Sequence, residues 1–374
     1  MSPRNLRLLL TAVGSRGDVE PRVALAQELR RRGHEATVAC ATSHRPIVER
    51  YGLEWALLGD HPPASVSAPV YASMADEPDP GRRGELLLRE LLVPMLPEIR
   101  QRLEHMATDF DLVVLNDLLT PFALPPVLDA AAVAVALTTQ PVGGFALMLA
   151  GSPVVKLVGS SPLLLPEDHG LDDTFVVTDF WAPTPNERFM PDPDLGRFIS
   201  GANDERPLVA VTVGSAWGTE PRLSFALLAA AARRAGVRLL VQDGGGGASC
   251  DDVASIGEVP YRWLFERVDA VVHHAGAGTI AETLRAGLPS VSVPHYGDHR
   301  YWAGRLEAVG VSAGTLIGGD LTEANLAAHL DRVVRDDGLQ ARARALAAGV
   351  DIAAGISRAC DCLETPRPTV SRGV

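Results

Sequence analysis

The fold is decided by one stretch in the C-terminal half, VDAVVHHAGAGTIAETLRAGLPSVSVP, which runs from Val268 to Pro294. It begins with a short apolar run, continues through a glycine-containing loop into a helical pattern, and ends in a second apolar run. Strands that alternate with helices in this way are typical of a parallel sheet covered by helices on both faces. The stretch therefore predicts an α/β domain.

The N-terminal half repeats this order of elements. Its patterns predict a strand at Leu6–Val13, a helix at about Val19–Arg32 and a strand at Glu35–Ala41. Two more buried strands are predicted at Asp111–Asp117 and Ala131–Thr139. The predicted fold class is α/β, with two doubly wound, Rossmann-like domains that face each other across a ligand cleft.

Two irregular stretches interrupt this pattern. Residues 59–84 and 179–207 are rich in proline and aspartate and are predicted to be loops, the second of them the linker between the domains. A final helical pattern, about Leu339–Leu363, is long enough to leave its own domain and pack back on the N-terminal one. The predicted division is an N-terminal domain, a C-terminal domain, and a last helix with a flexible tail, at residues 1–185, 186–345 and 346–374.

The composition is that of a globular protein. The chain has 374 residues, 47% of them hydrophobic, and its formal net charge of −12 argues against nucleic acid as a partner. No apolar stretch reaches the ~18 residues that cross a bilayer, so no transmembrane segment is predicted. The four cysteines are too few and too scattered for a disulfide scaffold, which favours a cytoplasmic location.

The loop HHAGAGT, His273–Thr279, has the composition of an anion site. Gly276 and Gly278 allow the backbone to approach an anion closely, and the helix that opens at about Ile280 directs its positive end there. His274 would add a charge-assisted hydrogen bond, and Thr279 would act as N-cap or phosphate ligand. A tight turn that needs glycine for packing alone is the alternative. The backbone amides that would donate belong to Ala277, Gly278 and Thr279.

Two similar Gly-Ser turns, TAVGSRGDVEP at Thr11–Pro21 and VTVGSAWGTEP at Val211–Pro221, begin the two halves. Neither turn fits the dinucleotide fingerprint, and the chain has no P-loop motif, which disfavours a dehydrogenase or a P-loop NTPase. Only the first turn carries an acid, Asp18. That carboxylate is either a helix cap or a base that faces a substrate hydroxyl.

Further polar residues follow predicted strands at the edge where ligands bind in parallel sheets. Glu282, one helical turn after Thr279, is placed to accept hydrogen bonds from ribose hydroxyls, and Asp298 with His299 is placed to meet hydroxyl groups of a ligand. In the N-terminal half, polar residues next to the apolar segment 142–149 form either an acceptor pocket or part of the core. These candidate acceptor residues are Asn116, Asp117, Gln140 and Phe145.

Three stretches carry a family resemblance. The run EVPYRWLFERVDAVVHHAGAGTIAETLRAGLPSVSVPHYGDHRYWAGRLEAVGV resembles the donor-binding region of GT-B, UDP-sugar-dependent glycosyltransferases, in particular the bacterial natural-product and sterol-glucosyltransferase-like branch. GSRGDVEP resembles the N-terminal signature of that family, and FWAPTPNERFMPDPDLGRFI its interdomain region. The combination of the HHxGxGT loop with a downstream Asp followed by Gln or His, here Asp298 and His299, is a much more specific signal than either part alone. Here His299 follows the acid where the family usually has Gln, and Glu258 stands where some relatives have an aromatic residue.

The resemblance implies a role for each matching position. It implies that the N-terminal domain binds the acceptor, that the C-terminal domain binds the nucleotide sugar, and that Asp18 is the general base. It implies that the diphosphate is held by His274, Gly276, Gly278, Thr279, Gly214 and Ser215. It implies that Val259 contacts the nucleotide base through its backbone and that Glu282 binds the ribose. Asp298 and His299 would bind the sugar hydroxyls.

The sequence thus predicts an inverting glycosyltransferase, a hexosyltransferase of secondary metabolism such as antibiotic biosynthesis. It would move a sugar from a nucleoside diphosphate sugar to a hydroxyl of a lipophilic natural product or sterol-like aglycone. UDP is favoured over dTDP because Glu282 can bind a ribose diol, and no metal or other cofactor is expected. The alternatives are a UDP-sugar 2-epimerase-like isomerase and a non-catalytic nucleotide-sugar-binding auxiliary protein.

Overall fold

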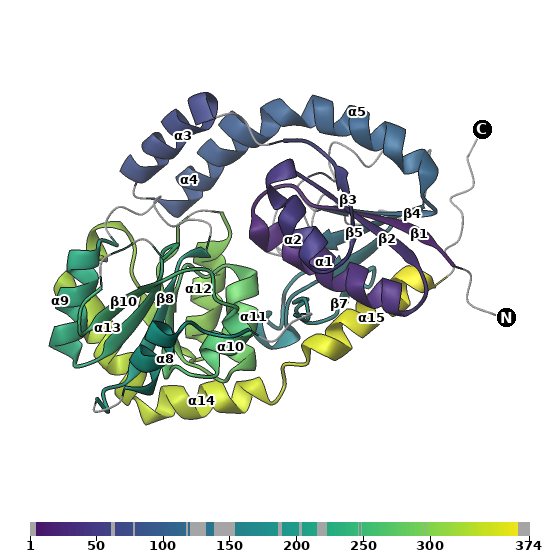
Figure 1. The fold of residues 1–374 in the computed structure, drawn as a ribbon. Helices are drawn as coiled ribbons and strands as arrows, with labels where there is room; N and C mark the ends of the chain where they lie inside the picture. Colours follow the sequence, from purple (N-terminus) through teal and green to yellow (C-terminus); the bar gives the residue numbers. More distant parts are fainter. Residues whose placement is uncertain are drawn as a thin grey trace. The chain divides into compact units, whose positions relative to one another are not determined.

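The structure is a computed structural model in which the chain divides into two compact units (Figure 1). It describes residues 5–60, 64–77, 79–116, 119, 132–137, 154–185, 189–201, 204–214, 223–245, 247, 249–295 and 297–365. The first unit comprises residues 1–67, 88–186 and 351–374, and the second comprises residues 68–87 and 187–350. The predicted division assigned residues 68–87 to the N-terminal domain, whereas the structure groups them with the second unit.

The first unit is built on a seven-stranded parallel sheet with the order β3-β2-β1-β4-β5-β6-β7. The order reverses direction at β1, which pairs with both β2 and β4, and this places a switch point after β1. The strands are β1 (Arg7–Thr11), β2 (Glu35–Cys40), β3 (Glu54–Leu57), β4 (Leu112–Asn116), β5 (Ala132–Leu137), β6 (Val155–Val158) and β7 (Phe175–Val177).

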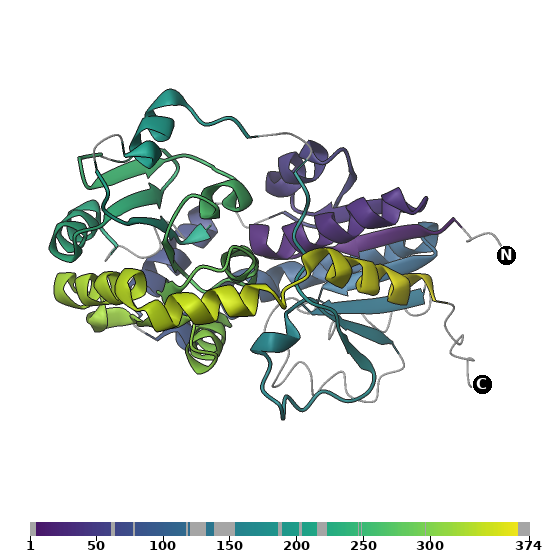
Figure 2. The same cartoon turned by 90° about the horizontal axis from the view of Figure 1, so that it is seen from below.

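Alternate residues of β1 enter two separate cores. Leu8 and Leu10 pack beneath α1 and α15 on one face, and Leu9 packs on the other face in the core that contains α5. α15 and α1 are in contact, and Figures 1 and 2 show α15 (yellow) beside α1 (purple). The helices are α1 (Arg16–Arg31), α2 (Arg45–Arg50), α5 (Leu96–Met106) and α15 (Ile352–Glu364).

The second unit has a six-stranded parallel sheet with the order β10-β9-β8-β11-β12-β13. Its strands are β8 (Leu208–Thr212), β9 (Arg238–Gln242), β10 (Val253–Ile256), β11 (Ala270–His273), β12 (Ser290–Ser292) and β13 (Ser312–Thr315). Its helices are most of α3 (Ala64–Asp76), then α4 (Pro80–Leu87), α8 (Pro193–Ser200), α9 (Phe225–Ala235), α10 (Tyr261–Phe265), α11 (Ala277–Arg285), α12 (His299–Ala308), α13 (Glu323–Arg335) and α14 (Asp337–Ala347). The two sheets confirm the predicted pair of Rossmann-like α/β domains.

The structure differs from the sequence prediction in two segments. The stretch 59–84, predicted as a loop, contains α3 and α4, and α4 begins with an Asp79 side chain that accepts from the Arg82 amide at 3.0 Å. The single final helix is two helices, because the chain turns at Gly349 and Asp351 then caps α15 by accepting from the Ala354 amide at 2.9 Å. No helix among the described residues is both long enough and apolar enough to cross a bilayer.

Candidate active site

The glycine loop of the second unit is a tight strand-to-helix turn. β11 ends at His273, Gly276 is the N-cap, and α11 begins at Ala277, three residues earlier than the sequence indicated. Ala275 takes a left-handed conformation with φ +65° and is fully buried, which is unusual for a residue with a Cβ. Thr279 is not the N-cap: it lies in the first turn, and its carbonyl accepts from the Thr283 hydroxyl at 2.7 Å.

The first turn of α11 presents the amides that the sequence assigned to anion binding. Ala277, Gly278 and Thr279 are its first three residues, and the amides of a first helical turn have no acceptor within their own helix. The positive end of the helix dipole lies at the same place, so an anion is stabilised there. The predicted candidates Gly276, Ala277, Gly278 and Thr279 thus all lie in one turn.

Two glycines pack against the ring of His274. A Cβ at Gly276 would lie 2.3 Å from His274 Nε2, and a Cβ at Gly214 would lie 2.9 Å from His274 Cε1. Gly214 also has a left-handed φ of +59°. The structure therefore brings the start of the loop after β8 to the His274 ring. Ser215, the other predicted residue of that loop, lies outside the described residues.

Three histidine rings form a cluster at this turn. The ring centroids of His274 and His299 are 4.7 Å apart in an edge-to-face arrangement, and the His295 ring lies 6.3 Å from His274 and 6.4 Å from His299. The His295 amide donates to His299 Nδ1 at 3.4 Å. Sequence analysis selected His274 and His299 separately and gave no signal that their rings meet.

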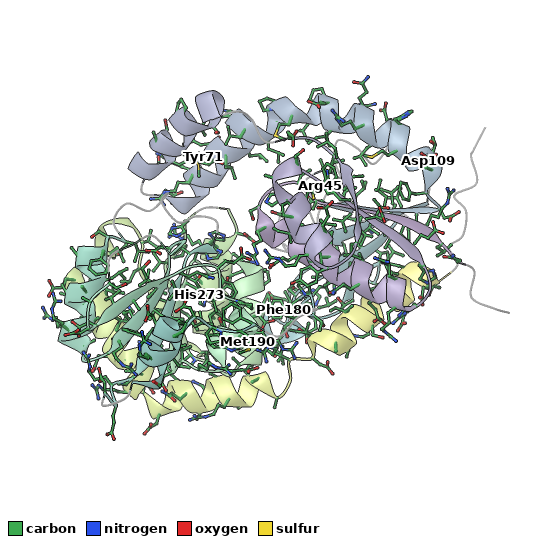
Figure 3. All side chains as sticks on the ribbon, in the orientation of Figure 1. Arg45, Tyr71, Asp109, Phe180, Met190 and His273 are labelled. Carbon is green, nitrogen blue, oxygen red and sulfur yellow. The ribbon has the colours of Figure 1, made fainter. Side chains whose placement is uncertain are left out.

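Burial lowers the pKa of His273, His274 and His299. Burial lowers the pKa of His273, which lies inside the second unit (Figure 3), to about 3. Burial, followed by repulsion from His295 and His273, lowers the pKa of His299 to about 3, and burial holds the pKa of His274 well below 6.5. A neutral His274 ring can donate only an ordinary hydrogen bond to an anion, not the charge-assisted bond predicted for it.

We expect the stability of the fold to fall with acidity because of these rings. His273 and His299 bind fewer protons folded than unfolded between their ordinary pKa of 6.5 and about 3, so their contribution is complete above pH 6.5 and is lost as the pH falls. Each should lower the free energy of unfolding by up to about 1.4 kcal/mol per pH unit. Urea unfolding between pH 7.5 and 5.5 measures this slope.

His299→Gln should remove one histidine's share of that slope, and replacement of the exposed His105 by Gln should leave the slope unchanged. A slope that the two variants alter equally would contradict the assignment of the acid sensitivity to the buried rings.

A buried polar network ties the β8 loop to the segment predicted to contact the base. Gln242 Nε2 donates to the Val259 carbonyl at 3.1 Å, and the Thr212 hydroxyl donates to Gln242 Oε1 at 3.2 Å. Thr212 also bonds the Tyr261 hydroxyl at 2.5 Å and accepts from the Gly214 amide at 3.4 Å. Sequence analysis missed these three side chains, although Thr212 and Gln242 are the last residues of β8 and β9 and lie in register.

The predicted ribose ligand already has a partner. Glu282 is 9% exposed, and its Oε2 accepts from Arg285 Nε at 2.6 Å. Arg285 also lies 3.7 Å from the carboxylate of Glu266, on the surface. A ribose bound at Glu282 would therefore share that carboxylate with Arg285.

The predicted sugar ligand Asp298 is anchored by an indole. Its Oδ2 accepts from Trp302 Nε1 at 2.8 Å, and Trp302 is fully buried in the first turns of α12. The indole holds the carboxylate at the start of that helix. His299, the next residue, is 6% exposed and contacts His274. The structure thus brings the His299 ring to the glycine loop, and the bond from Trp302 fixes the carboxylate of Asp298, the residue before His299.

In the first unit Asp18 belongs to a capping box. Ser15 is the N-cap of α1, and its hydroxyl accepts from the Gly17 amide at 3.2 Å. Asp18 is the third helical residue, and its Oδ2 accepts from the Ser15 amide at 2.8 Å and the Ser15 hydroxyl at 3.3 Å. A Cβ at Gly14 would lie 2.3 Å from the same Oδ2. The carboxylate is half-buried after β1, at the switch point of the sheet.

Of the acceptor candidates, only Asn116 lies within the described residues. It ends β4, is fully buried, and donates its backbone amide to the Thr11 hydroxyl at 2.9 Å, at the end of the neighbouring strand β1. Asn116 and the turn that carries Asp18 therefore follow adjacent strands. Asp117, Gln140 and Phe145 lie outside the part of the chain that the structure describes.

Two parts of the chain match families of known proteins. Residues 8–112 match the "Glycosyltransferase family 28 N-terminal domain", and residues 242–355 match the "Erythromycin biosynthesis protein CIII-like, C-terminal domain". The chain is 30% identical to O-mycaminosyltylonolide 6-deoxyallosyltransferase of Streptomyces fradiae, over 96% of this chain and 97% of the relative.

More distant relatives extend this comparison. The chain is 25% identical to a sterol 3-beta-glucosyltransferase of Komagataella phaffii over 97% of its own length, and it spans 34% of that relative. Among solved structures, the spinosyn rhamnosyltransferase SpnG has a TM-score of 0.72 at 17% identity, over 96% of this chain and 100% of that one. The same rhamnosyltransferase has been solved with thymidine diphosphate and with the spinosyn aglycone.

Proposed function

Because the chain belongs to the natural-product glycosyltransferase family that contains the Streptomyces fradiae 6-deoxyallosyltransferase, we propose that it transfers a sugar from a nucleoside diphosphate sugar to a hydroxyl of a lipophilic small molecule. One observation carries this proposal: in the turn from His273 to Thr279, the first-turn amides of α11 directly follow Gly276, against which the ring of His274 packs. Donors fixed in this way stabilise the negative charge that a departing diphosphate develops.

The proposed reaction is a direct displacement. The acceptor hydroxyl oxygen attacks the anomeric carbon of the sugar, the bond from that carbon to the diphosphate breaks, and the electron pair leaves with the diphosphate. Asp18 takes the proton of the attacking hydroxyl, and attack opposite the leaving group inverts the anomeric centre. The supporting observation is the place of Asp18, a half-buried carboxylate in the first turn of α1, the helix that follows β1 at the switch point of the sheet.

We propose that the donor carries UDP, with dTDP as the alternative. The support for UDP is Glu282, a carboxylate one turn after the anion site, whose oxygens can accept from both ribose hydroxyls. The support for dTDP is a structural relative that has been solved with thymidine diphosphate. No metal is required in this proposal, because helix amides and His274 supply the donors to the diphosphate.

A ribose role for Glu282 predicts a change in nucleotide selectivity. Glu282→Ala should weaken UDP at least about tenfold and dUDP less, because dUDP lacks one of the two hydroxyls. Isothermal titration of both nucleotides measures the ratio. Glu266→Ala is the matched control, because it removes an acid near Arg285 without removing the proposed ribose acceptor. An unchanged ratio of UDP to dUDP affinity in Glu282→Ala would contradict the ribose role.

A screen of donors and acceptors tests the whole proposal. UDP- and dTDP-sugars are incubated with lipophilic hydroxyl-bearing aglycones, and mass spectrometry detects a product heavier by one glycosyl group. We expect a product that needs both substrates. Isomerisation of a UDP-sugar without any acceptor, or binding of donors without turnover, would contradict a transferase function.

A further inference from the structure

A short segment from the N-terminal half of the sequence is packed on the loop that carries the proposed sugar ligands. This segment, residues 77–84, contains the start of α4, and the structure groups it with the second unit. The loop connects β12 to α12 and contains His295, Gly297 and Asp298, and His299 is the first residue of α12. α4 contacts α12, which this loop begins (Figure 1).

Three contacts hold the segment to the loop. Arg83 Nη1 donates to the His295 carbonyl at 3.3 Å, and Arg300 Nη1 lies 3.2 Å from Asp79 Oδ2. Between them the two backbones touch, since a Cβ at Gly84 would lie 2.8 Å from the Gly297 amide nitrogen and 3.1 Å from its Cα. The contacts therefore bracket Asp298 and His299 from both sides in sequence.

Arg83 is the buried member of this group. It is 2% exposed, and its Nε donates to the Glu77 carbonyl at 2.5 Å while Nη1 reaches His295. A guanidinium has five donors and cannot lose its charge, so its burial is favourable only when carbonyls or carboxylates surround it. The neighbouring Arg82, in contrast, has a side chain that is 75% exposed.

Arg83 is linked to the ring of His299 by two hydrogen bonds through the backbone of His295. Arg83 holds the carbonyl of His295, and the amide of the same residue donates to His299 Nδ1. The backbone of His295 is thus fixed on both sides of its Cα. A neutral imidazole carries one N–H. Because Nδ1 accepts, the proton of His299 is on Nε2, which makes that nitrogen a hydrogen-bond donor.

We propose that Arg83 is a positioning residue for the donor sugar, which acts through His295 to fix the orientation and the Nε2–H tautomer of His299. This inference rests on the proposed function for the role of His299 toward the sugar, but the tautomer is a property of the chain itself. Loss of Arg83 should affect the nucleotide part of the site much less than the sugar part, because Arg83 bonds to His295 and reaches the glycine loop only indirectly, through the His299 ring that packs on His274.

The test compares Arg83→Met with the control Arg82→Met by two measurements. Long-range proton–nitrogen NMR spectra, with His299 assigned from His299→Gln, should show one Nε2–H tautomer in the wild type and in Arg82→Met, and a mixture in Arg83→Met. Isothermal titration with UDP, dTDP and their glucose conjugates should show free-nucleotide affinity within about twofold of wild type in both variants. For the nucleotide sugar, Arg83→Met should lose about tenfold and Arg82→Met should not change.

Arg83→Lys keeps a charge and part of the donor set, and it should recover part of the nucleotide-sugar affinity. It also serves as the second variant if Arg83→Met melts well below wild type. A wild-type tautomer and wild-type nucleotide-sugar affinity in Arg83→Met, or equal losses for free nucleotide and nucleotide sugar, would overturn the positioning role. A wild-type protein that binds no nucleotide sugar would contradict the proposed function, and the tautomer measurement would still decide the role of Arg83 toward His299.

Discussion

Asp18→Asn is expected to reduce the rate of sugar transfer at least about a hundredfold, the range found for the loss of a general base. Free-nucleotide affinity should stay within about twofold, because Asp18 lies in the first unit and the glycine loop in the second. Single-turnover transfer and isothermal titration with the nucleotide separate these two effects.

The capping box makes this substitution informative. Asn keeps a side-chain oxygen that can accept from the Ser15 amide, so the start of α1 stays capped while the proton acceptor is lost. Ser15→Ala is the comparison for stability: it removes the N-cap oxygen and should cost about 1 kcal/mol, more than Asp18→Asn. If Asp18→Asn turned over like the wild type, Asp18 would be a cap and not the base.

Gly276→Ala is expected to have the second largest effect. The new Cβ would lie 2.3 Å from Nε2 and 3.0 Å from Cδ2 of His274, so the ring must move. That ring packs on His299 and is held by Gly214 on another side, so the shift disturbs the whole turn. We expect a loss of about 1–3 kcal/mol in unfolding free energy and a loss of nucleotide affinity of at least about tenfold.

Gly278→Ala is the matched control two residues later. Gly278 is helical, and a Cβ built on it has open space around it. Apart from its chain neighbours and the backbone of its own helix, no heavy atom of the described residues lies within 4 Å of that Cβ. Alanine should therefore stabilise the folded chain by up to about 1 kcal/mol. If the diphosphate lies against the first turn of α11, the same methyl group should weaken nucleotide binding. A Gly278→Ala variant with wild-type nucleotide affinity would place the anion elsewhere.

The sequence was sufficient to predict the two sheets and the turn at His273–Thr279. Apolar runs and glycines are local signals, and the strand ends they mark are where the candidate residues lie. The packing between segments that are distant in sequence could not be predicted from the sequence. The meeting of His274, His295 and His299 depends on how the β11 and β12 loops fold toward each other.

Other features of the structure do have a local signal in the sequence. Asp79-Pro80 is an N-cap followed by the proline that favours the first helical position, and it marks the start of α4. Ser15 with Asp18 is a capping box that uses Asp where Glu or Gln is usual. The bond between Thr212 and Gln242, in contrast, follows from strand register, which the sequence does not contain.

The membership of residues 68–87 in the second unit has a consequence for engineering. If the second unit binds the donor as proposed, the simplest hybrid that exchanges this unit has one junction in the linker before residue 187. In this chain a single junction near residue 186 would separate Arg83 and Gly84 from their own loop at His295 and Gly297. A hybrid that exchanges the second unit should therefore also exchange residues 77–84, as a separate second insertion.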